Sequence, residues 1–406
     1  MRLRQTIRLL AGALVLTGVA LPAAAQTPTM ATPAGAVYTM TNAPEGNAVV
    51  AFARGTDGAL TKLGMFPTGG NGTGVKRLPK MEADNGIDPL VSNASLVLSC
   101  NGRMLFAVNA GSNTVTCFQV RPDATLAAVG VTPTGGTAPN GVAMHGDLVY
   151  IANAGSPAKG EAASLTGFRC DPNGRLVAMA QSARPLSSAK AHPAHALFSP
   201  KGDFLLVTEI MTDKISVYRV GPTGLLSAPA STDAAKDSFG MCFTGPYRFV
   251  VTEAQGGAKM GGTGKASVSS CILSTEGAIT PVSKSVGNNQ TAACWAQVSC
   301  DGRFVYSSNT DSGNISCYTH NAEDGSIKLG KEVAAMMKPE KGETSGPIDS
   351  AMSRDGKFFY QLYSANGAVV GYRVEKNGDL TPMDKGTMMM SMGLPMAAGF
   401  QGLAAW

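Results

Sequence analysis

A short, strongly apolar phrase returns seven times along the chain, and each time it ends on or near a polar residue. The seven phrases are Val37–Asn42, Leu105–Asn109, Val149–Asn153, Leu205–Glu209, Phe249–Glu253, Val305–Asn309 and Phe359–Tyr363. They return at a mean interval of about 54 residues, and periods of this size are typical of propellers, solenoids and arrays. The chain is therefore predicted to be a repeat protein.

Each phrase belongs to a larger unit of β-structure. A second strand with alternating apolar and polar residues follows most phrases, as in Val115–Val120 and Ile215–Val220. Asp-Gly and Asn-Gly turns come next, for example at Gly58 and Gly378, and supply the positive φ that tight hairpins require. A further hairpin precedes the phrase, so each unit predicts four antiparallel strands, here called A to D in order.

Seven four-stranded units predict an all-β fold, a seven-bladed β-propeller. The first unit lacks room for a strand A, because the first phrase begins so soon after the N-terminal segment. The last residues, 399–406, form a strand with no unit of its own. We therefore expect this C-terminal strand to complete blade 1.

The first 25 residues have the features of a secretory signal peptide. Three arginines precede an apolar stretch of residues 9–21, and a small-residue cleavage site ends at Ala25. The stretch is too short for a membrane span of about 20 residues. Residues 26–406 are then a single propeller domain, periplasmic or secreted, without membrane insertion and monomeric. Loss of the three arginines lowers the formal charge from +5 to +2, which excludes a strongly basic nucleic-acid-binding surface.

Eight cysteines in an exported chain raise the question of disulfides. Cys100 and Cys117 occupy the same repeat positions as Cys300 and Cys317, separated by strand B, and a bridge across two strand spacings exceeds disulfide geometry. Two interpretations stay open. The cysteines are small buried apolar residues, or at least one bridge joins two blades and involves Cys242, Cys294 or another pair.

The whole mature chain resembles the lactonase-type seven-bladed propellers, the family of the propeller 6-phosphogluconolactonases and the carboxymuconate cyclases. The resemblance lies in residues 199–209, 290–295, 308–315, 346–349 and 402–405. It implies a hydrolase or isomerase that acts on a small lactone or sugar-acid substrate. The family's phosphogluconolactonase branch carries Pro-His-x-His and later an arginine. Here His192 and His195 are three apart and Lys214 replaces the arginine, which argues against a phosphosugar substrate.

One ring of candidate site residues lies at the ends of the strand B phrases. Glu209 and Glu253 would present two carboxylates from adjacent blades, an arrangement suited to acid/base chemistry. Hairpin register also makes a contact between His192 and Glu209 plausible. The other members of this ring are Asn42, Asn109, Asn153, Asn309 and Tyr363. Asparagines at strand ends either bind substrate or hold the next loop by hydrogen bonds.

A second ring is found where the strand A segments are aligned. One equivalent position carries Ser95, His195, Trp295 and Asp349, with Phe239 and Gly240 or Asn140 close to it in two other blades. The flanking positions stay apolar from blade to blade, whereas this position changes its chemistry each time. Such diversification indicates a binding or catalytic surface.

We therefore expect catalysis at the channel mouth formed by the B-to-C and D-to-A connections, with a small-molecule ligand. The predicted catalytic residues are His192, His195, Glu209, Glu253 and Asp349, and the predicted substrate-binding residues are Asn109, Asn153, Trp295, Asn309 and Tyr363. No cofactor and no metal are expected, although the cluster Met388–Met396 is either an apolar connection or a set of thioethers for Cu(I). The alternative function is a non-catalytic propeller that binds a small molecule, glycan or partner protein through the same face.

Overall fold

The computed structural model describes residues 32–406 except 84–85, 384–386 and 389–398, and Thr32–Trp406 form one compact unit. The predicted signal peptide and all but the first residue of the methionine cluster lie outside the described residues. Over the part of the chain that is described, no helix has the length and apolar character needed to cross a membrane.

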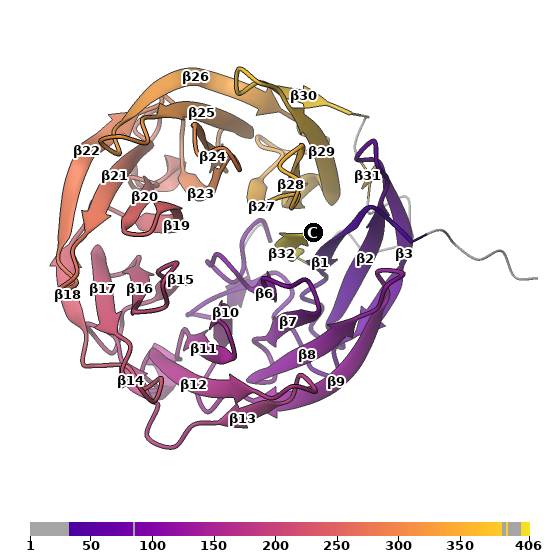
Figure 1. Ribbon diagram of the computed structural model, residues 1–406, viewed down its shortest axis with the longest axis vertical. Coiled ribbons are helices and arrows are strands. Elements are labelled where there is room, and N and C mark those ends of the chain that lie inside the picture. Colours follow the sequence, from indigo (N-terminus) through magenta and orange to yellow (C-terminus); the bar gives the residue numbers. More distant parts are fainter. Residues whose placement is uncertain (1–31, 84–85, 384–386, 389–398) are drawn as a thin grey trace, which may run out of the picture. The chain divides into compact units, whose positions relative to one another are not determined.

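Seven antiparallel sheets follow one another around a ring, so the predicted seven-bladed β-propeller is confirmed (Figure 1). Each predicted phrase is strand B of its blade. The strands A are β32 (Gln401–Ala405), β6 (Leu96–Leu98), β10 (Pro139–His145), β15 (Pro193–Phe198), β19 (Ser238–Gly245), β23 (Ala293–Val298) and β27 (Pro347–Met352). The strands B are β1 (Gly35–Met40), β7 (Met104–Asn109), β11 (Leu148–Asn153), β16 (Phe204–Glu209), β20 (Arg248–Glu253), β24 (Phe304–Asn309) and β28 (Phe358–Tyr363).

The two outer strands of each blade complete the sheets. The strands C are β2 (Ala48–Arg54), β8 (Thr114–Val120), β12 (Ser164–Cys170), β17 (Lys214–Arg219), β21 (Ser267–Leu273), β25 (Asn314–His320) and β29 (Ala368–Val374). The strands D are β3 (Leu60–Pro67), β9 (Leu126–Pro133), β13 (Leu176–Ala178), β18 (Ala230–Asp233), β22 (Ile279–Gly287), β26 (Ile327–Met336) and β30 (Leu380–Pro382).

A few short elements lie outside this repeat. They are β14 (Arg184–Pro185) and β31 (Thr387–Met388), which add to blades 3 and 7, the ribbon of β4 (Lys76–Arg77) and β5 (Glu82–Ala83), and the 3-10 turns η1 (Pro157–Lys159), η2 (Ala258–Met260) and η3 (Ser364–Asn366). The ribbon belongs to the long connection between blades 1 and 2.

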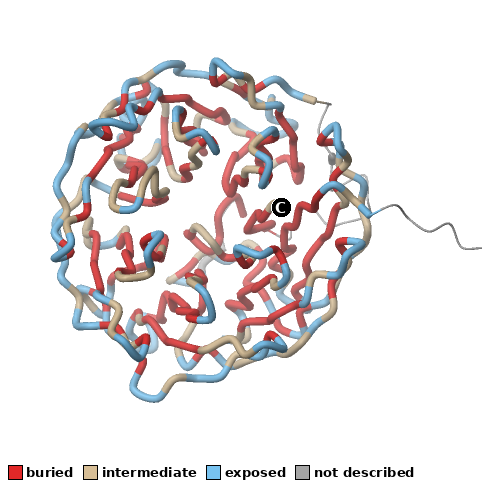
Figure 2. The backbone as a smooth tube through the Cα atoms, viewed as in Figure 1, coloured by how far each residue is buried: buried red, intermediate tan, exposed pale blue. Residues whose placement is uncertain are grey.

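Burial follows the position of a strand within its blade. Most residues of strands A to C are buried, whereas strands D and the turns carry most of the exposed positions (Figure 2). Tyrosines of strand B tie four of the blades to the next one, because their hydroxyls donate to a carbonyl in the neighbouring C-to-D turn: Tyr38 to Ala124, Tyr150 to Gly224, Tyr306 to Gly378 and Tyr360 to Gly58. Buried polar groups are paired in this way, which explains the aromatic residue within the repeated phrase.

The C-terminal strand closes the ring as predicted. β32 pairs with β1 in antiparallel register, with Val37 opposite Ala405 and Thr39 opposite Leu403, and it lies at the inner end of blade 1 (Figure 1). Phe400 and Leu403 are buried against the central apolar cluster. Residues more than 350 positions apart in sequence therefore share one sheet.

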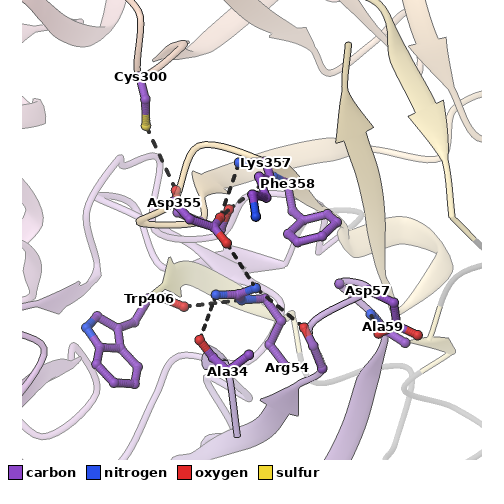
Figure 3. A network of polar contacts seen from close by, with 12 residues as sticks. Ala34, Arg54, Asp57, Ala59, Cys300, Asp355, Lys357, Phe358 and Trp406 are labelled. Atoms are coloured by element: carbon purple, nitrogen blue, oxygen red, sulfur yellow. Dashed lines mark hydrogen bonds and ion pairs between the residues drawn. The ribbon is translucent and has the colours of Figure 1, made fainter.

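A buried arginine joins this closure to the last blade. Arg54 donates to the Trp406 carbonyl at 3.4 Å and to the Ala34 carbonyl at 2.8 Å, and its guanidinium lies 3.6 Å from the Asp355 carboxylate of blade 7 (Figure 3). The guanidinium also covers the Phe358 ring at 5.4 Å. The side chain is only 3% exposed, so these bonds are shielded from water.

We expect Arg54→Met to lower the free energy of unfolding by about 1–3 kcal/mol, because it leaves buried carbonyls without a donor. Urea unfolding of the purified protein measures this loss. Arg303→Met is the matched control, since Arg303 also pairs with an aspartate and covers a phenylalanine at 5.1 Å, but its side chain is 56% exposed. A loss in the control as large as in Arg54→Met would contradict the role assigned to burial.

A β-bulge recurs at the start of strand A. The register shifts between Pro139 and Gly141, between Pro193 and His195, between Ala293 and Trp295, and at the same place in blades 1, 5 and 7. Bulges re-aim the neighbouring side chains and are common beside functional sites. The repeated bulge thus gives the second ring of candidate residues its common orientation.

Candidate active site

The carboxylate of Glu209 is engaged by hydrogen bonds at the edge of its own blade. It accepts from the Ser216 hydroxyl at 2.6 Å, the Thr212 hydroxyl at 2.8 Å and the Ser187 backbone N–H at 3.0 Å, with the Ser187 hydroxyl as a further donor. The carboxylate therefore holds the D-to-A connection that carries Ser187. These contacts favour a structural role over the predicted catalytic one.

The other members of the strand B ring are bound in the same manner. Glu253 accepts from the hydroxyls of Ser267 and Ser269 on the adjacent strand C. Asn109 and Asn309 each donate to polar side chains of strand C and accept from an asparagine that follows a strand of the preceding blade. Asn153 donates to Thr166 of strand C. The Tyr363 and Tyr372 hydroxyls lie 2.7 Å apart. This ring couples strands and blades, and its predicted substrate-binding role gains no support from these contacts.

An unpredicted segment lies inside the ring. Residues 86–95, from the long connection before β6, cross from blade to blade: the Ser364 hydroxyl donates to the Ile87 carbonyl, and the Asn93 N–H donates to the Ala194 carbonyl. Blades 7 and 4 are thereby bridged by one loop, which lies inside the ring (Figure 1). Because it contacts the starts of the strands A, we name residues 86–95 the inner loop, and it occupies the mouth where an open pocket was predicted.

His192 packs against the inner loop and not against Glu209, while His195 contacts blade 5. His192 Nε2 lies 3.0 Å from the Val91 carbonyl and 3.2 Å from Asn140 Nδ2, while His195 Nδ1 accepts from the Met241 N–H at 3.0 Å. Burial lowers the pKa of each histidine to about 4. The predicted contact of His192 with Glu209 does not occur among the described contacts, and both rings are neutral near pH 7.

Two buried carboxyl groups lie near each other at the inner loop, since the charge of Asp88 acts on Asp349. Asp349 of strand A in blade 7 is 3% exposed, and Asp88 of the inner loop is 8% exposed. Burial, with a smaller contribution from the nearby charge of Asp88, raises the pKa of Asp349 to about 7. Burial also raises the pKa of Asp88 to about 6, against the opposing effect of the Arg77 guanidinium. Neighbouring buried carboxyls with raised pKa values are an arrangement that acid/base catalysis uses.

The surroundings of this pair are polar and incompletely paired. The Gly402 N–H donates to Asp349 Oδ2 at 2.8 Å, and a side chain at Gly402 would collide with Ser95. Several buried polar atoms here have no hydrogen-bond partner within the described part of the chain: Asp88 Oδ1, Ser95 Oγ, Asn140 Oδ1, His192 Nδ1, Trp295 Nε1 and both polar side-chain atoms of Gln401. Buried polar groups are normally satisfied, so this cluster is suited to bind water or a polar ligand.

Trp295 and Gln401 lie close to the two carboxyls although they fall outside hydrogen-bond geometry. The Trp295 indole N–H lowers the pKa of Asp349, and the Gln401 amide lowers that of Asp88. The Trp295 ring packs on Phe239 with centroids 5.0 Å apart and is 2% exposed. Its indole N–H thus faces the carboxyl side, while the ring belongs to the core and is not an open apolar wall.

Exposure increases toward the other end of the strands A. Their first residues are buried, whereas later positions are half-buried: Val97, Met144, Leu197, Cys242 and Gln297. A groove of about 670 Å³ also lies at this end, between the hairpins of blades 2 and 3. This face therefore carries a groove, and its strand A residues are less buried than those beside the inner loop.

The described residues contain no ready cluster of metal-binding side chains. Among residues 32–406, apart from the three masked segments, no group of three or more histidine, cysteine, aspartate or glutamate side chains could hold a metal ion. The candidate site is thus described by its own acids, amides and hydroxyls.

Asp349 should leave a signature in the pH dependence of stability. Its pKa is about 7 in the folded chain against 3.8 ordinarily, so the unfolded chain loses this proton first, and the free energy of unfolding falls as the pH rises from about 4 to about 7. We expect Asp349→Asn to remove this fall, on the order of a few kcal/mol. The buried histidines, whose pKa values are lowered, change the free energy of unfolding in the opposite direction. Thermal unfolding of the wild-type protein and of Asp349→Asn is therefore compared at each pH. Parallel plots of stability against pH for the two proteins would contradict the raised pKa assigned to Asp349.

Sequence reasoning found Asp349 and Trp295 but missed Asp88, Gln401 and the inner loop. The signal for the loop was length, because 28 residues separate β3 from β6 and most other blade connections are much shorter. Long connections in compact domains are often functional. Asp88 carries no repeat signature, since it lies outside the repeat.

Comparisons with known proteins agree with this architecture. The family model described as "Lactonase, 7-bladed beta-propeller" matches residues 73–173 and 96–393. No curated protein matches the chain. Similar solved structures include a candidate 6-phosphogluconolactonase from Bacteroides uniformis, with 17% identity, a TM-score of 0.64 and coverage of 90% of this chain and 98% of the other. The periplasmic gluconolactonase of Pseudomonas aeruginosa shares 17% identity, with a TM-score of 0.60 and coverage of 87% and 96%. At these identities the structures show a common fold.

Proposed function

Since the chain belongs to the lactonase family of seven-bladed β-propellers, we propose that it hydrolyses a small lactone of the sugar-acid type at the centre of the ring. The observation that carries this proposal is the two neighbouring buried acids Asp349 and Asp88, whose pKa values are raised to about 7 and about 6, so that both can exchange protons near neutral pH. A lactonase needs a base to activate water and an acid to assist the leaving oxygen. The pair supplies both.

The two carboxyls take different roles in this mechanism. Asp88 has the lower pKa and an unpartnered Oδ1, so it accepts a proton from the attacking water. Asp349 has the higher pKa and donates its proton to the ring oxygen as the acyl–oxygen bond breaks. The indole N–H of Trp295 and the amide of Gln401 are donors for the carbonyl oxygen, which becomes negatively charged in the transition state. Addition of one water to the lactone yields the hydroxy acid.

The substrate approaches along the strands A from the end opposite the inner loop. The half-buried residues at that end and the buried carboxyls beneath the loop support this direction. We also propose that the protein is exported to the periplasm or secreted, with cleavage near Ala25, as the N-terminal pattern indicates. The gluconolactonase of Pseudomonas aeruginosa, which shares the fold, is periplasmic by name.

A lactone panel tests the proposal. Purified residues 26–406 are incubated with γ- and δ-lactones of aldonic acids and with simple aliphatic lactones, and acid release is followed with a pH indicator. We expect turnover of at least one polar lactone above the rate of a heat-denatured sample. Absence of turnover across the panel, with the protein folded, would contradict hydrolysis.

One observation favours a second candidate, a non-catalytic binding propeller. The inner loop covers the starts of the strands A, and both carboxyls are almost fully buried, which suits retention of a ligand better than rapid turnover. Calorimetric titration with the same panel separates the two functions. Binding without acid release would support the binder.

A further inference from the structure

Two cysteines of neighbouring blades pack in one apolar cluster between blades 2 and 3. Cys117 lies in β8 of blade 2, and Cys170 is the last residue of β12 in blade 3. Burial, and after it the neighbouring Cys170 thiol, raise the pKa of Cys117, so the two thiols are neighbours. The Cys170 thiol itself donates to the Asp171 carbonyl at 3.7 Å. A β-carbon placed on Gly174, in the turn after Cys170, would lie 3.5 Å from the Cys117 sulfur. Both residues also pack in one apolar cluster, so the contact does not depend on a single atom pair.

One of the two thiols can be reached from solvent. Cys170 is half-buried and lines the groove of about 670 Å³ between blades 2 and 3, whereas Cys117 is buried beneath it. The exposed thiol of Cys100 lines the same groove. A small disulfide reagent can therefore reach Cys170 first.

We propose that Cys117 and Cys170 form a disulfide that crosslinks blades 2 and 3 when the chain meets a low-molecular-weight disulfide oxidant such as oxidised glutathione. All eight cysteines are free thiols in the structure, which therefore represents the reduced form. The predicted alternative of a bridge between two blades finds its partners here, and not at Cys242 or Cys294.

The reaction proceeds as two thiol–disulfide exchanges. The Cys170 thiolate attacks one sulfur of the oxidised glutathione, and the S–S bond breaks to release one glutathione thiolate. The Cys117 thiolate then attacks the Cys170 sulfur of the mixed disulfide and releases the second glutathione. Two protein thiols are oxidised, one glutathione disulfide is reduced to two thiols, and the two protons pass to the glutathione thiolates.

The crosslink stabilises the ring because it closes a loop of about 50 residues and so restricts the unfolded chain. It also joins two blades that are otherwise held by packing and by side-chain hydrogen bonds. We expect a rise in the melting temperature of roughly 3–8 °C on oxidation.

Peptide mapping of the oxidised protein tests the assignment. Folded residues 26–406 are incubated with oxidised glutathione, alkylated under denaturing conditions and digested with trypsin without reductant. Cys117 falls on the peptide of residues 104–159, because Arg121 precedes a proline, Cys170 falls on residues 170–175, and Cys100 falls on residues 81–103. We expect residues 104–159 linked to residues 170–175, and a fall from eight alkylated cysteines to six.

Thermal unfolding with matched variants completes the test. Cys170→Ser should lose both the crosslink and the oxidation-dependent rise in melting temperature, whereas Cys242→Ser, another half-buried cysteine, should keep both. Retention of all eight thiols after oxidation, or a disulfide between any other pair, would overturn the proposal. The wild-type map decides this even where a variant folds poorly.

Discussion

Deletion of residues 399–406 is expected to abolish the cooperative unfolding of the propeller. The deletion removes β32, leaves β1 as an unpaired edge and breaks the only sheet that joins the two ends of the described chain. It also exposes the partners of Phe400 and Leu403, and loss of these two buried side chains alone costs about 3–6 kcal/mol. Limited proteolysis and thermal unfolding should both report a global loss of structure.

A point variant at the same terminus separates strand loss from loss of one side chain. Trp406→Ala keeps β32 and the backbone pair between Trp406 and Ala36, so it should unfold cooperatively at a slightly lower temperature. A truncated protein as stable as the full chain would show that the ring does not need this closure.

Asp349→Asn is expected to lower kcat/KM on an accepted lactone by about 10²–10⁴, the range of a typical general acid–base contribution. The amide keeps an oxygen for the Gly402 N–H but cannot deliver a proton at neutral pH. Stability near pH 8 should be unchanged or higher, because an ionised carboxylate no longer has to be buried. Asp88→Asn should show a similar loss, since the pair shares one task.

Two controls distinguish catalysis from folding. Asp301→Asn, in the blade 6 hairpin at the more open end, removes a half-exposed carboxylate and should leave kcat/KM unaltered. Glu209→Gln should lower stability, because four donors lose their anionic acceptor, while activity per folded molecule persists. Full activity in Asp349→Asn would place the chemistry elsewhere.

The experiments on lactone hydrolysis and on the disulfide are independent. Cys117 and Cys170 lie in the strands C of blades 2 and 3, in a different apolar cluster from the one that holds Trp295 beside Asp349. Failure of the lactone panel would therefore leave the crosslink untouched, and the reverse also holds.

The amino-acid sequence by itself determined the number of blades, the order of the strands and the closure by the C-terminus. These follow from local signals: an alternation of period two, a turn that needs positive φ, and the return of one phrase seven times. The same signals placed Asp349 and Trp295 at one equivalent position of strand A. Repetition made these predictions possible, because each blade repeats the same local pattern of strands and turns.

Only the tertiary structure decided which polar residues share a site. Glu209 and Glu253 occupy promising positions in the repeat, yet the hydroxyls of strand C and the D-to-A loops take up their lone pairs. Asp88 lies in a connection outside the repeat. It is 261 positions from Asp349 in the sequence, and only folding brings the two residues near each other. The pKa values of the two acids arise from burial beneath the inner loop, and burial of this kind depends on how seven blades and one loop pack together, which no local pattern encodes.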